Sequence, residues 1–168
     1  MTVELICVGT ELLLGNIVNT NARYLSEKCA MLGLSVYYIT TVGDNRERMQ
    51  EAIRTALSRA DIVFLNGGLG PTEDDITKDV CAEVMGISLH EDPAVRKHLE
   101  DWYRQRNRTD IPESNWRQAL VPDGAVVFPN PNGTAPGLAL KKDGKTAILL
   151  PGPPNEVHNF FEQQISPY

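Results

Sequence analysis

The sequence predicts a three-layer α/β/α sandwich with a mostly parallel sheet, formed by one domain over residues 1–168. Short β-rich apolar runs alternate with amphipathic helical segments, the order that gives a parallel sheet covered by helices on both faces. Most of these runs end in a turn rich in Gly, Asp or Pro, residues that interrupt regular structure. A chain of this length fits one domain and can bury about 70% of its unfolded surface, enough for a full core.

The first half of the chain supplies three strand-and-helix units. The first strand is almost continuously apolar, as is typical of a strand buried on both faces, and the second is rich in β-branched and aromatic residues. A helix is expected after each strand because apolar residues recur at helical spacing. The expected strands are residues 3–8, 35–42 and 61–65. The helical stripes lie within residues 22–32, 49–57 and 76–84, with Asn19, Thr20 or Asn21 as the first cap and Gly33 and Gly86 as stops.

The second half begins with an expected helical insertion over about residues 91–120, packed beside the sheet. Asp92 can cap its helix and Pro93 suits the first helical position. Its apolar stripe, expected in the core, consists of Val95, Leu99, Trp102 and Tyr103. Short strands return from residue 125, and the run 146–150 leads into PGPP. The last helix has one apolar side, formed by Val157, Phe160, Phe161 and Ile165.

Charge and composition argue against several classes of partner. The net charge of −6 and the pI of about 5.1 repel polyanions, so no nucleic-acid partner is expected. The opening MTVELICVGTELLLG has no basic start and contains Glu4 and Glu11, so it predicts no signal peptide or membrane span, and we expect a cytoplasmic protein. Cys7, Cys29 and Cys81 lie in apolar runs without a CxxC pair, which predicts buried, reduced thiols.

Four turns are predicted to meet at one edge of the sheet. Residues 9–11, 43–45, 67–70 and 151–154 each follow an expected strand directly. The carboxyl ends of parallel strands share an edge, and ligands of open α/β sheets bind there. The sequence therefore places its candidate ligand site along these four turns.

The loop of residues 66–79 (NGGLGPTEDDITKD) is the strongest candidate for binding an anion. Its three glycines let backbone N–H groups approach a phosphate or carboxylate, and the following helix presents a partly positive N-terminus. The loop matches neither a Walker A motif nor a GxGxxG fingerprint. A tight strand-to-helix turn is an equally good interpretation of the loop by itself.

The carboxylates near this loop also have two interpretations. Capping of the next helix is the better explanation for Glu73, Asp74 or Asp75 taken singly, and Asp44 has the same alternative. The combination of Asp75 with Asp44 on a neighbouring turn favours a binding site. Two carboxylates and a bound phosphate are suitable ligands for Mg²⁺, Mn²⁺ or Co²⁺.

Any catalysis at this site is expected to depend on such a cation. Arg46 and Lys78 are the obvious basic residues near the turns, so an anionic ligand needs backbone donors and a metal to offset its charge. The sequence has no GxSxG motif, no cysteine in a polar turn and no histidine pair at ligand spacing. Metal-assisted attack on phosphorus is the reaction that these side chains permit.

Five segments together resemble the amino-terminal domain of the competence-damage-inducible protein family (CinA). They are VGTELLLGNIVNTN, TVGDN, GGLGPTEDDITKD, PNGTAPG and LLPGPPNE, and the resemblance extends over nearly the whole chain. That domain is similar to the molybdopterin-binding fold of the MogA and MoaB proteins, in which a GGTG-type loop and an Asp handle molybdopterin. The resemblance places Asp75 at that Asp and Asp44 at the second family carboxylate. Leu69 stands where the adenylyltransferase branch has Thr, which argues against a role in cofactor biosynthesis.

The resemblance implies a metal-dependent ADP-ribose pyrophosphatase that forms AMP and ribose 5-phosphate. Asp44 and Asp75 would hold the cation, which activates water for attack on phosphorus. The backbone cradle for the diphosphate would be Gly67, Gly68, Leu69 and Gly70. The other residues expected to contact the ligand are Thr10, Glu11, Asn19, Thr72, Pro151 and Gly152.

Two alternatives to hydrolysis stay open at this point. The same site could transfer an adenylyl group to molybdopterin, or it could belong to a non-catalytic binding or regulatory module. In each case the expected partner is a nucleotide or pterin small molecule, and a homo-oligomer is expected because related domains associate. Longer family members carry a nicotinamide mononucleotide deamidase domain after this one, and no amidase activity is transferred to this chain.

Overall fold

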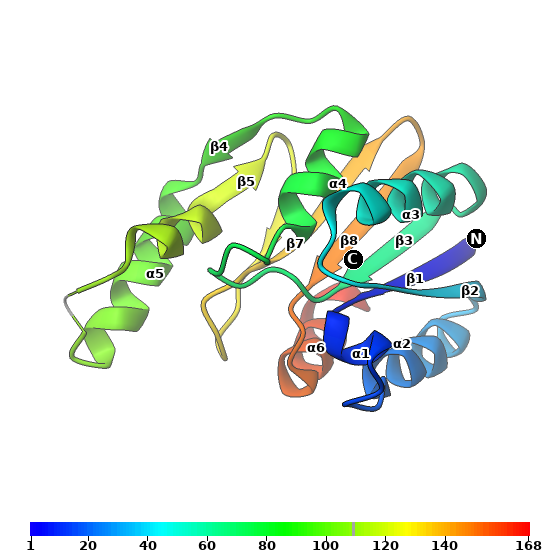
Figure 1. Ribbon diagram of the computed structural model, residues 1–168, viewed down its shortest axis with the longest axis horizontal. Coiled ribbons are helices and arrows are strands. Elements are labelled where there is room, and N and C mark those ends of the chain that lie inside the picture. The colour runs from blue at the N-terminus through cyan, green and yellow to red at the C-terminus, as the bar shows by residue number, and fades with distance from the viewer. Residues whose placement is uncertain (109) are drawn as a thin grey trace.

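The computed structural model describes residues 1–108 and 110–168, and a six-stranded sheet lies at its centre (Figure 1). The sheet has the order β2-β1-β3-β8-β7-β6, and a separate two-stranded ribbon pairs β4 with β5. The strands are β1 (Thr2–Val8), β2 (Ser35–Val42), β3 (Ile62–Asn66), β4 (Leu89–Glu91), β5 (Leu120–Pro122), β6 (Val126–Phe128), β7 (Gly137–Lys142) and β8 (Lys145–Leu150). The helices are α1 (Thr10–Leu13), α2 (Thr20–Met31), α3 (Arg46–Arg59), α4 (Thr77–Met85), α5 (Pro93–Gln105), the 3₁₀ helix η1 (Glu113–Ala119), α6 (Pro154–Phe160) and the π-helical turn η2 (Phe161–Ile165).

The sheet is mostly parallel, as the alternation of strands and helices predicts. β2, β1, β3 and β8 pair in parallel, whereas β7 and β6 complete the sheet in antiparallel fashion. The four parallel strands therefore end at the same edge, and the turns that follow them are neighbours in space. The predicted mostly parallel sheet is thus confirmed.

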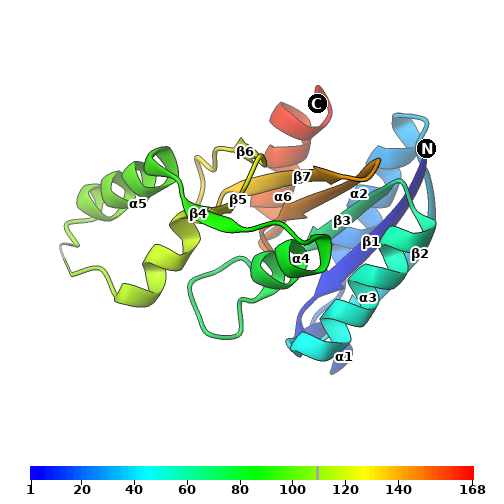
Figure 2. The ribbon, with the colours of Figure 1, turned by 90° about the horizontal axis from the view of Figure 1, so that it is seen from above.

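Two helical layers cover the sheet. α3 and α4 lie on one face, and α2 and α6 lie on the other (Figures 1 and 2). Successive residues of the inner strands alternate between the two cores: Val63 and Leu65 pack toward α3 and α4, whereas Phe64 packs toward α2 and α6. Burial on both faces is the physical reason for the unbroken apolar runs in β1 and β3.

The first helices begin and end largely where the sequence predicts. Asn19 caps α2, since its Oδ1 accepts from the backbone N–H of Ala22 at 3.1 Å. Gly86 ends α4 in the left-handed conformation. The short helix α1 was not predicted, because its four residues are too few to show a helical period, and none of them is buried.

The insertion contains more than the predicted helix. Asp92 caps α5 by accepting from Ala94 and Val95, and Val95 and Leu99 extend the core that α3 and α4 cover. The ribbon of β4 and β5 was missed, because strands of three residues carry too little pattern to be recognised. The 3₁₀ helix η1 lies within the segment expected to be helical. Figure 1 places α5 beyond this ribbon, at one end of the sheet.

The side chains expected in the core are largely there. Tyr103 is buried, whereas Trp102 is half-buried and stacks beneath the guanidinium of Arg106 at 3.5 Å. All three cysteines are buried and reduced, and burial raises the pKa of Cys29 to about 11 and that of Cys81 to about 12. Such thiols are poor nucleophiles at neutral pH. Among the described helices, none is long and apolar enough to cross a membrane.

Candidate functional site

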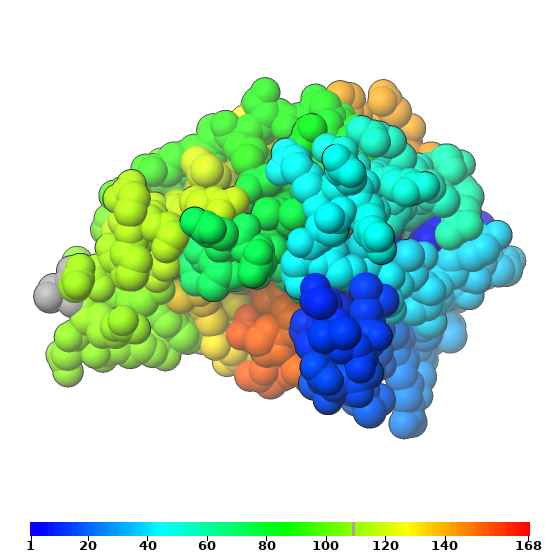
Figure 3. Space-filling model, in the orientation of Figure 1, coloured from blue at the N-terminus to red at the C-terminus, as the bar shows by residue number. Residues whose placement is uncertain are grey.

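A cleft of about 400 Å³ lies along the edge where β1, β2, β3 and β8 end. In the space-filling view, the segment that follows β8 is recessed between α1 and the loop that precedes α4 (Figure 3). The predicted site residues that line the cleft are Glu11, Asp44, Gly67, Gly68, Leu69, Gly70, Thr72, Asp75, Pro151 and Gly152. The structure therefore brings ten of the sequence-predicted residues to one surface, from turns that are up to 141 positions apart in the chain, the separation of Glu11 and Gly152.

The turns after β1 and β2 are joined through Thr10 and Asp44. Asp44 Oδ2 accepts from the backbone N–H of Thr10 at 3.1 Å and from Thr10 Oγ1 at 2.8 Å. Asp44 does not cap α3, because Asn45 does so by accepting from the N–H of Arg48 at 3.0 Å. Asp44 thus lies at the cleft, and Thr10 positions it.

The glycine loop fits tightly against the end of β1. Gly67 has a φ of +107°, and a Cβ placed on it would lie 2.4 Å from the carbonyl oxygen of Val8. Gly68 has a φ of +69°, and its Cβ would lie 2.1 Å from Thr77 Oγ1. Only glycine satisfies both the backbone conformation and the space at these two positions. Figure 2 shows the remainder of this loop extending away from the sheet before α4 begins.

The backbone N–H groups of this loop are not all available to a ligand. The N–H of Gly67 donates to Leu150 O at 2.9 Å, so it cannot take part in the phosphate cradle that the sequence predicts. Within residues 1–108 and 110–168, the amides of Gly68, Leu69 and Gly70 have no acceptor. The cradle is therefore reduced to these three donors.

Asp75 closes the loop and does not cap the helix. Its Oδ2 accepts from the N–H of Thr72 at 2.9 Å and from Thr72 Oγ1 at 2.6 Å. α4 begins at Thr77, and its cap residue, Ile76, offers no side-chain hydrogen bond. The capping interpretation is thus wrong for Asp75, and its carboxylate lies directly beside Gly70, whose Cβ would be 2.5 Å from Oδ2.

A buried pair of asparagines fixes the turn after β8. Asn66 Nδ2 donates to Pro151 O at 2.6 Å, and Asn21 Nδ2 donates to both Asn66 Oδ1 and Gly152 O at 2.8 Å. These bonds hold Pro151 and Gly152 beside the glycine loop. Neither asparagine was singled out for this role, because the contact joins segments that are far apart in the sequence.

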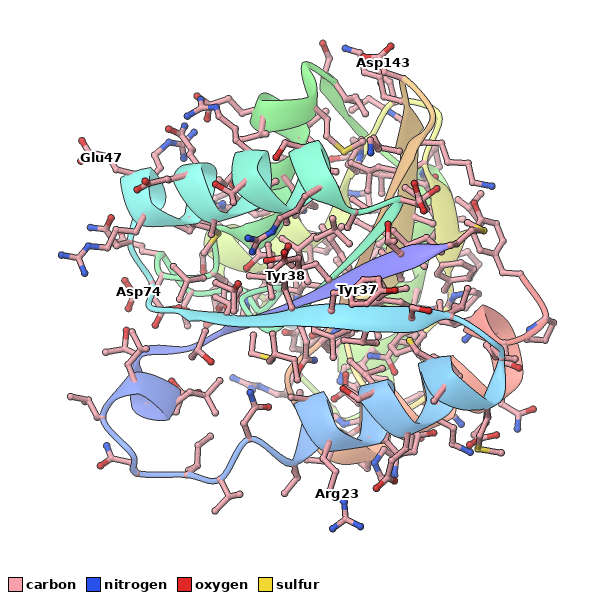
Figure 4. All side chains as sticks on the ribbon, turned by 90° about the vertical axis from the view of Figure 1, so that its right-hand side faces the viewer. Arg23, Tyr37, Tyr38, Glu47, Asp74 and Asp143 are labelled. Carbon is pink, nitrogen blue, oxygen red and sulfur yellow. The ribbon has the colours of Figure 1, made fainter. Side chains whose placement is uncertain are left out.

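Five carboxylates line the cleft, and among its described lining residues none is Lys, Arg or His. They are Glu11, Asp44, Asp74, Asp75 and Glu156. Figure 4 shows Asp74 beside the end of β2 from which α3 starts. A diphosphate bound here without a compensating cation would be repelled by its surroundings.

The two basic residues that the sequence places near the turns do not line this cleft. Arg46 pairs with Glu83 on the outer side of α3 and α4. Lys78 Nζ donates to the carbonyl oxygen of Arg117 at 2.5 Å, and burial lowers the pKa of Lys78 to about 8. The need for an added cation is therefore greater than the sequence indicates.

A cation in this cleft cannot be held by protein carboxylates alone. In the part of the chain that the structure describes, no three His, Cys, Asp or Glu side chains are grouped closely enough to bind a metal ion. Mg²⁺ commonly binds through one or two carboxylates and completes its shell with phosphate oxygens and water. The donor set present here, dispersed carboxylates beside a glycine loop with unpaired amides, fits that kind of shared site.

Two predicted residues, Thr10 and Asn19, do not line the cleft, and several lining residues were missed. Asn19 is occupied as the cap of α2 and does not line the cleft. Glu156 comes from the first turn of α6, where its Oε2 accepts from Asn130 Nδ2 at 2.7 Å. The segment LLPGPPNE pointed to this turn without identifying Glu156 as a site residue. Gln118 and Thr134 also line the cleft. The segment PNGTAPG contains Thr134 without identifying it as a site residue, and no pattern in the sequence marks Gln118.

Comparisons with known proteins agree with this architecture. The profile of the MoCF_biosynth family, described as "Probable molybdopterin binding domain", matches residues 4–168. A protein of Caldicellulosiruptor bescii that is named as competence-damage inducible is 52% identical over 168 residues, which is 100% of this chain and 41% of that protein. A protein of the same name from Symbiobacterium thermophilum is 53% identical over 169 residues, again 100% of this chain and 39% of that protein. The chain therefore spans about two fifths of the length of these curated relatives.

Solved structures show the same fold. The protein CinA of Thermoplasma acidophilum, of unknown function, has a TM-score of 0.89 and 32% identity over 99% of this chain and 96% of that chain. The molybdopterin biosynthesis enzyme MoaB of Thermus thermophilus has a TM-score of 0.65 and 18% identity over 98% of this chain and 89% of that chain, a likeness of fold alone. The family profile and the long matches at about 50% identity together assign the sequence to a family. The chain belongs to the competence-damage inducible protein (CinA) family and corresponds to its amino-terminal, molybdopterin-binding-like domain.

Proposed function

We propose that this domain hydrolyses ADP-ribose to AMP and ribose 5-phosphate in a reaction that requires a divalent cation. One observation carries the proposal: the cleft combines three unpaired amides of a glycine loop with five carboxylates and, among its described lining residues, no basic side chain. The amides suit phosphate oxygens, and the carboxylates suit a hard cation that would offset the charge of the diphosphate. The resemblance to the family implies the same activity.

Backbone amides and carboxylates have different roles in the proposed reaction. The N–H groups of Gly68, Leu69 and Gly70 bind the phosphate oxygens and orient the diphosphate. Asp44 and Asp75 are the carboxylates that would hold Mg²⁺, Mn²⁺ or Co²⁺, and such a cation supplies positive charge where negative charge develops on phosphorus. A cleft carboxylate that is not bound to the cation can accept the proton that the attacking water loses.

The direct test measures AMP release from ADP-ribose by the purified chain with Mg²⁺, Mn²⁺ or Co²⁺ and with a chelator. The proposal expects AMP and ribose 5-phosphate in equal amounts, formed only with a cation. ADP-ribose that binds tightly but stays intact with every cation would rule out hydrolysis and favour a binding or regulatory module. Binding that is indifferent to cations would favour the same module.

Adenylyl transfer to molybdopterin is the second candidate. The description of the family profile and the fold likeness to MoaB favour it. The two reactions differ in the group that attacks phosphorus, which is water in one and the pterin phosphate in the other. Incubation with ATP and molybdopterin separates them, because only the transferase forms an adenylylated pterin.

A further inference from the structure

Gln118 joins the insertion to the glycine loop. It lies near the end of η1 and is 3% exposed, and its Nε2 donates to Leu69 O at 3.1 Å. η1 is fixed at this place by Lys78, which donates to Arg117 O, and by an ion pair of 2.7 Å between Arg117 and Asp79. The Gln118 side chain is therefore held at the wall of the cleft by its neighbours.

The other amide atom of Gln118 has no partner. Its Oε1 is buried without a hydrogen bond among the described residues. The amide cannot be turned around, because Leu69 O can only accept a hydrogen bond and must face Nε2. A buried acceptor left unpaired costs about 1–3 kcal/mol, so a hydrogen bond from a donor on a bound ligand would be favourable at this oxygen.

Position distinguishes Gln118 from the other buried polar atoms without partners. Within residues 1–108 and 110–168 these belong to Asn21, Ser26, Thr77 and Gln118. Of the four, only Gln118 lines the cleft. It also lines a small pocket behind the glycine loop, so it lies between the phosphate-binding segment and the insertion.

The chemistry of the neighbouring site indicates which donor this is. Phosphate oxygens are acceptors, so a phosphate placed against Oε1 would be repelled. The nearest hydrogen-bond donors to the phosphates of a nucleoside diphosphate sugar are the hydroxyls of its riboses. We propose that Gln118 recognises the ligand by accepting, at Oε1, a hydrogen bond from a ribose hydroxyl next to the bound phosphate. This proposal rests on the proposed function only in that the ligand is a ribose phosphate.

Calorimetric titration with stable sugar phosphates tests this recognition without turnover. The probes are AMP and ribose 5-phosphate, each compared with its 2-deoxy and 3-deoxy forms in the presence of Mg²⁺. The wild-type chain should bind one hydroxyl-bearing probe about tenfold more tightly than the form that lacks the contacted hydroxyl, the size of one hydrogen bond. In Gln118→Met, which keeps the shape of the side chain, this difference should vanish. Gln105→Met, a matched change at an exposed position on α5, should retain it.

Several outcomes would overturn the proposal. If Gln118→Met weakens the hydroxyl and deoxy probes by the same factor, Gln118 merely supports the loop through Leu69 O. If the wild-type chain does not distinguish the probes, the proposal fails without recourse to any variant, which covers a Gln118→Met chain that does not fold. If no ribose phosphate binds, this proposal fails, whereas the hydrolase proposal is decided separately by AMP release from ADP-ribose. If discrimination depends on Gln118 but ADP-ribose is never cleaved, recognition stands and hydrolysis is excluded.

Discussion

Asp44 Oδ2 accepts two hydrogen bonds from Thr10, at 3.1 Å from the backbone nitrogen and at 2.8 Å from Oγ1. These bonds fasten the turn after β2 to the turn after β1, so the carboxylate has a fixed direction before any ligand arrives. Oδ2 is occupied by Thr10, whereas Oδ1 accepts no hydrogen bond from the residues that the structure describes and is available for the proposed cation. The position of the Asp44 carboxylate and its negative charge can therefore be tested separately.

Thr10→Val and Asp44→Asn separate these contributions. Valine removes the Oγ1 bond but keeps the backbone bond, so we expect kcat/KM for ADP-ribose to fall by less than about tenfold with an unchanged cation requirement. Asparagine keeps an acceptor for Thr10 but removes the charge, so the Mg²⁺ concentration for half-maximal rate should rise by at least about tenfold. Initial rates across a Mg²⁺ titration give both numbers. An Asp44→Asn chain with the cation dependence of the wild type would remove Asp44 from the metal site.

Asp75→Asn is expected to abolish turnover while the fold is retained. An amide oxygen can still accept from Thr72, so the loop should keep its shape, but the charge needed for the cation is gone. We expect a loss of about a hundredfold or more in AMP release. Asp143→Asn, in the exposed turn between β7 and β8, is the matched control, since Asn accepts the positive φ of that position.

Figure 4 places Asp143 well apart from Asp74 at the cleft, so the control should keep the wild-type rate. Thermal unfolding followed by circular dichroism checks the fold of both variants. An Asp75→Asn chain that releases AMP at the wild-type rate would exclude Asp75 from the mechanism.

Gly68→Ala should destabilise the domain more than Gly124→Ala. Both glycines have a left-handed φ, +69° and +72°, which costs an alanine about 1–2 kcal/mol. A Cβ at residue 124 meets nothing within 4 Å, whereas one at residue 68 lies 2.1 Å from Thr77 Oγ1. Overpacking of this kind adds roughly 1–3 kcal/mol, measurable by urea unfolding.

Removing the clash should recover part of the loss at residue 68. The double variant Gly68→Ala, Thr77→Ala keeps the unfavourable φ but removes the hydroxyl that the new Cβ meets. Contacts of 3.2 Å with the Cβ of residue 77 and 3.3 Å with Val8 Cγ1 remain, so its stability relative to Thr77→Ala should fall by less than Gly68→Ala falls, but by somewhat more than Gly124→Ala falls, each relative to the wild type. Equal losses of stability for Gly68→Ala and Gly124→Ala would contradict this prediction, because they would show that the loop accommodates a Cβ at residue 68.

Lys78 should make stability depend on pH in the alkaline range. Burial lowers its pKa to about 8 from the 10.5 of an exposed lysine, so between these values the unfolded chain binds more protons than the folded chain. The unfavourable burial of the charged ammonium is fully present below pH 8, and stability rises as pH increases toward 10.5, by up to about 1.4 kcal/mol per pH unit from this group. Other groups titrate there too, so the relevant quantity is the difference between the wild type and Lys78→Met.

Between pH 8 and pH 10 the free energy of unfolding of the wild type should rise relative to that of Lys78→Met. Lys97→Met, at a side chain that is 72% exposed, is the control. Its free energy of unfolding should depend on pH in the same way as that of the wild type. Urea unfolding at pH 7, 8, 9 and 10 supplies the free energies. If the free energy of unfolding of Lys78→Met changed with pH in parallel with that of the wild type, burial would not lower the pKa of Lys78 and the prediction would be wrong.

The elements predicted from the sequence are those whose pattern is local and long. α2, α3 and α5 carry apolar stripes over three turns or more, and β1 and β3 are buried on both faces, so spacing and composition identify them. α1, β4 and β5 have three or four residues each, too few for a period to appear. Their existence depends on tertiary contacts: β4 and β5 form only because their pairing partners are brought together.

The same limit applies to the site. The turns were predictable because parallel strands end on one edge, and that rule needs only the order of the elements. The role of a side chain or amide within a turn depends on its hydrogen-bond partner, which the sequence does not reveal. Asp75 accepts from Thr72 and does not cap the helix, and the Gly67 amide donates to Leu150 O and is not available to a ligand. Gln118 reaches Leu69 across a separation of 49 residues, and no local signal marks such a contact.

The pairing of β4 with β5 means that the insertion starts and finishes at the same place. Glu91 lies opposite Leu120, and residues opposed in an antiparallel pair have their Cα atoms about 5 Å apart. A two-residue turn can bridge that gap, so everything between these two positions is removable in principle without redirecting the main chain. A shortened chain of this kind would keep the glycine loop and the five carboxylates but lose Gln118 and the apolar cover supplied by Val95 and Leu99. The insertion thus enters and leaves the fold at one point, and its contributions to the cleft and to the core can be examined separately from the four turns of the sheet.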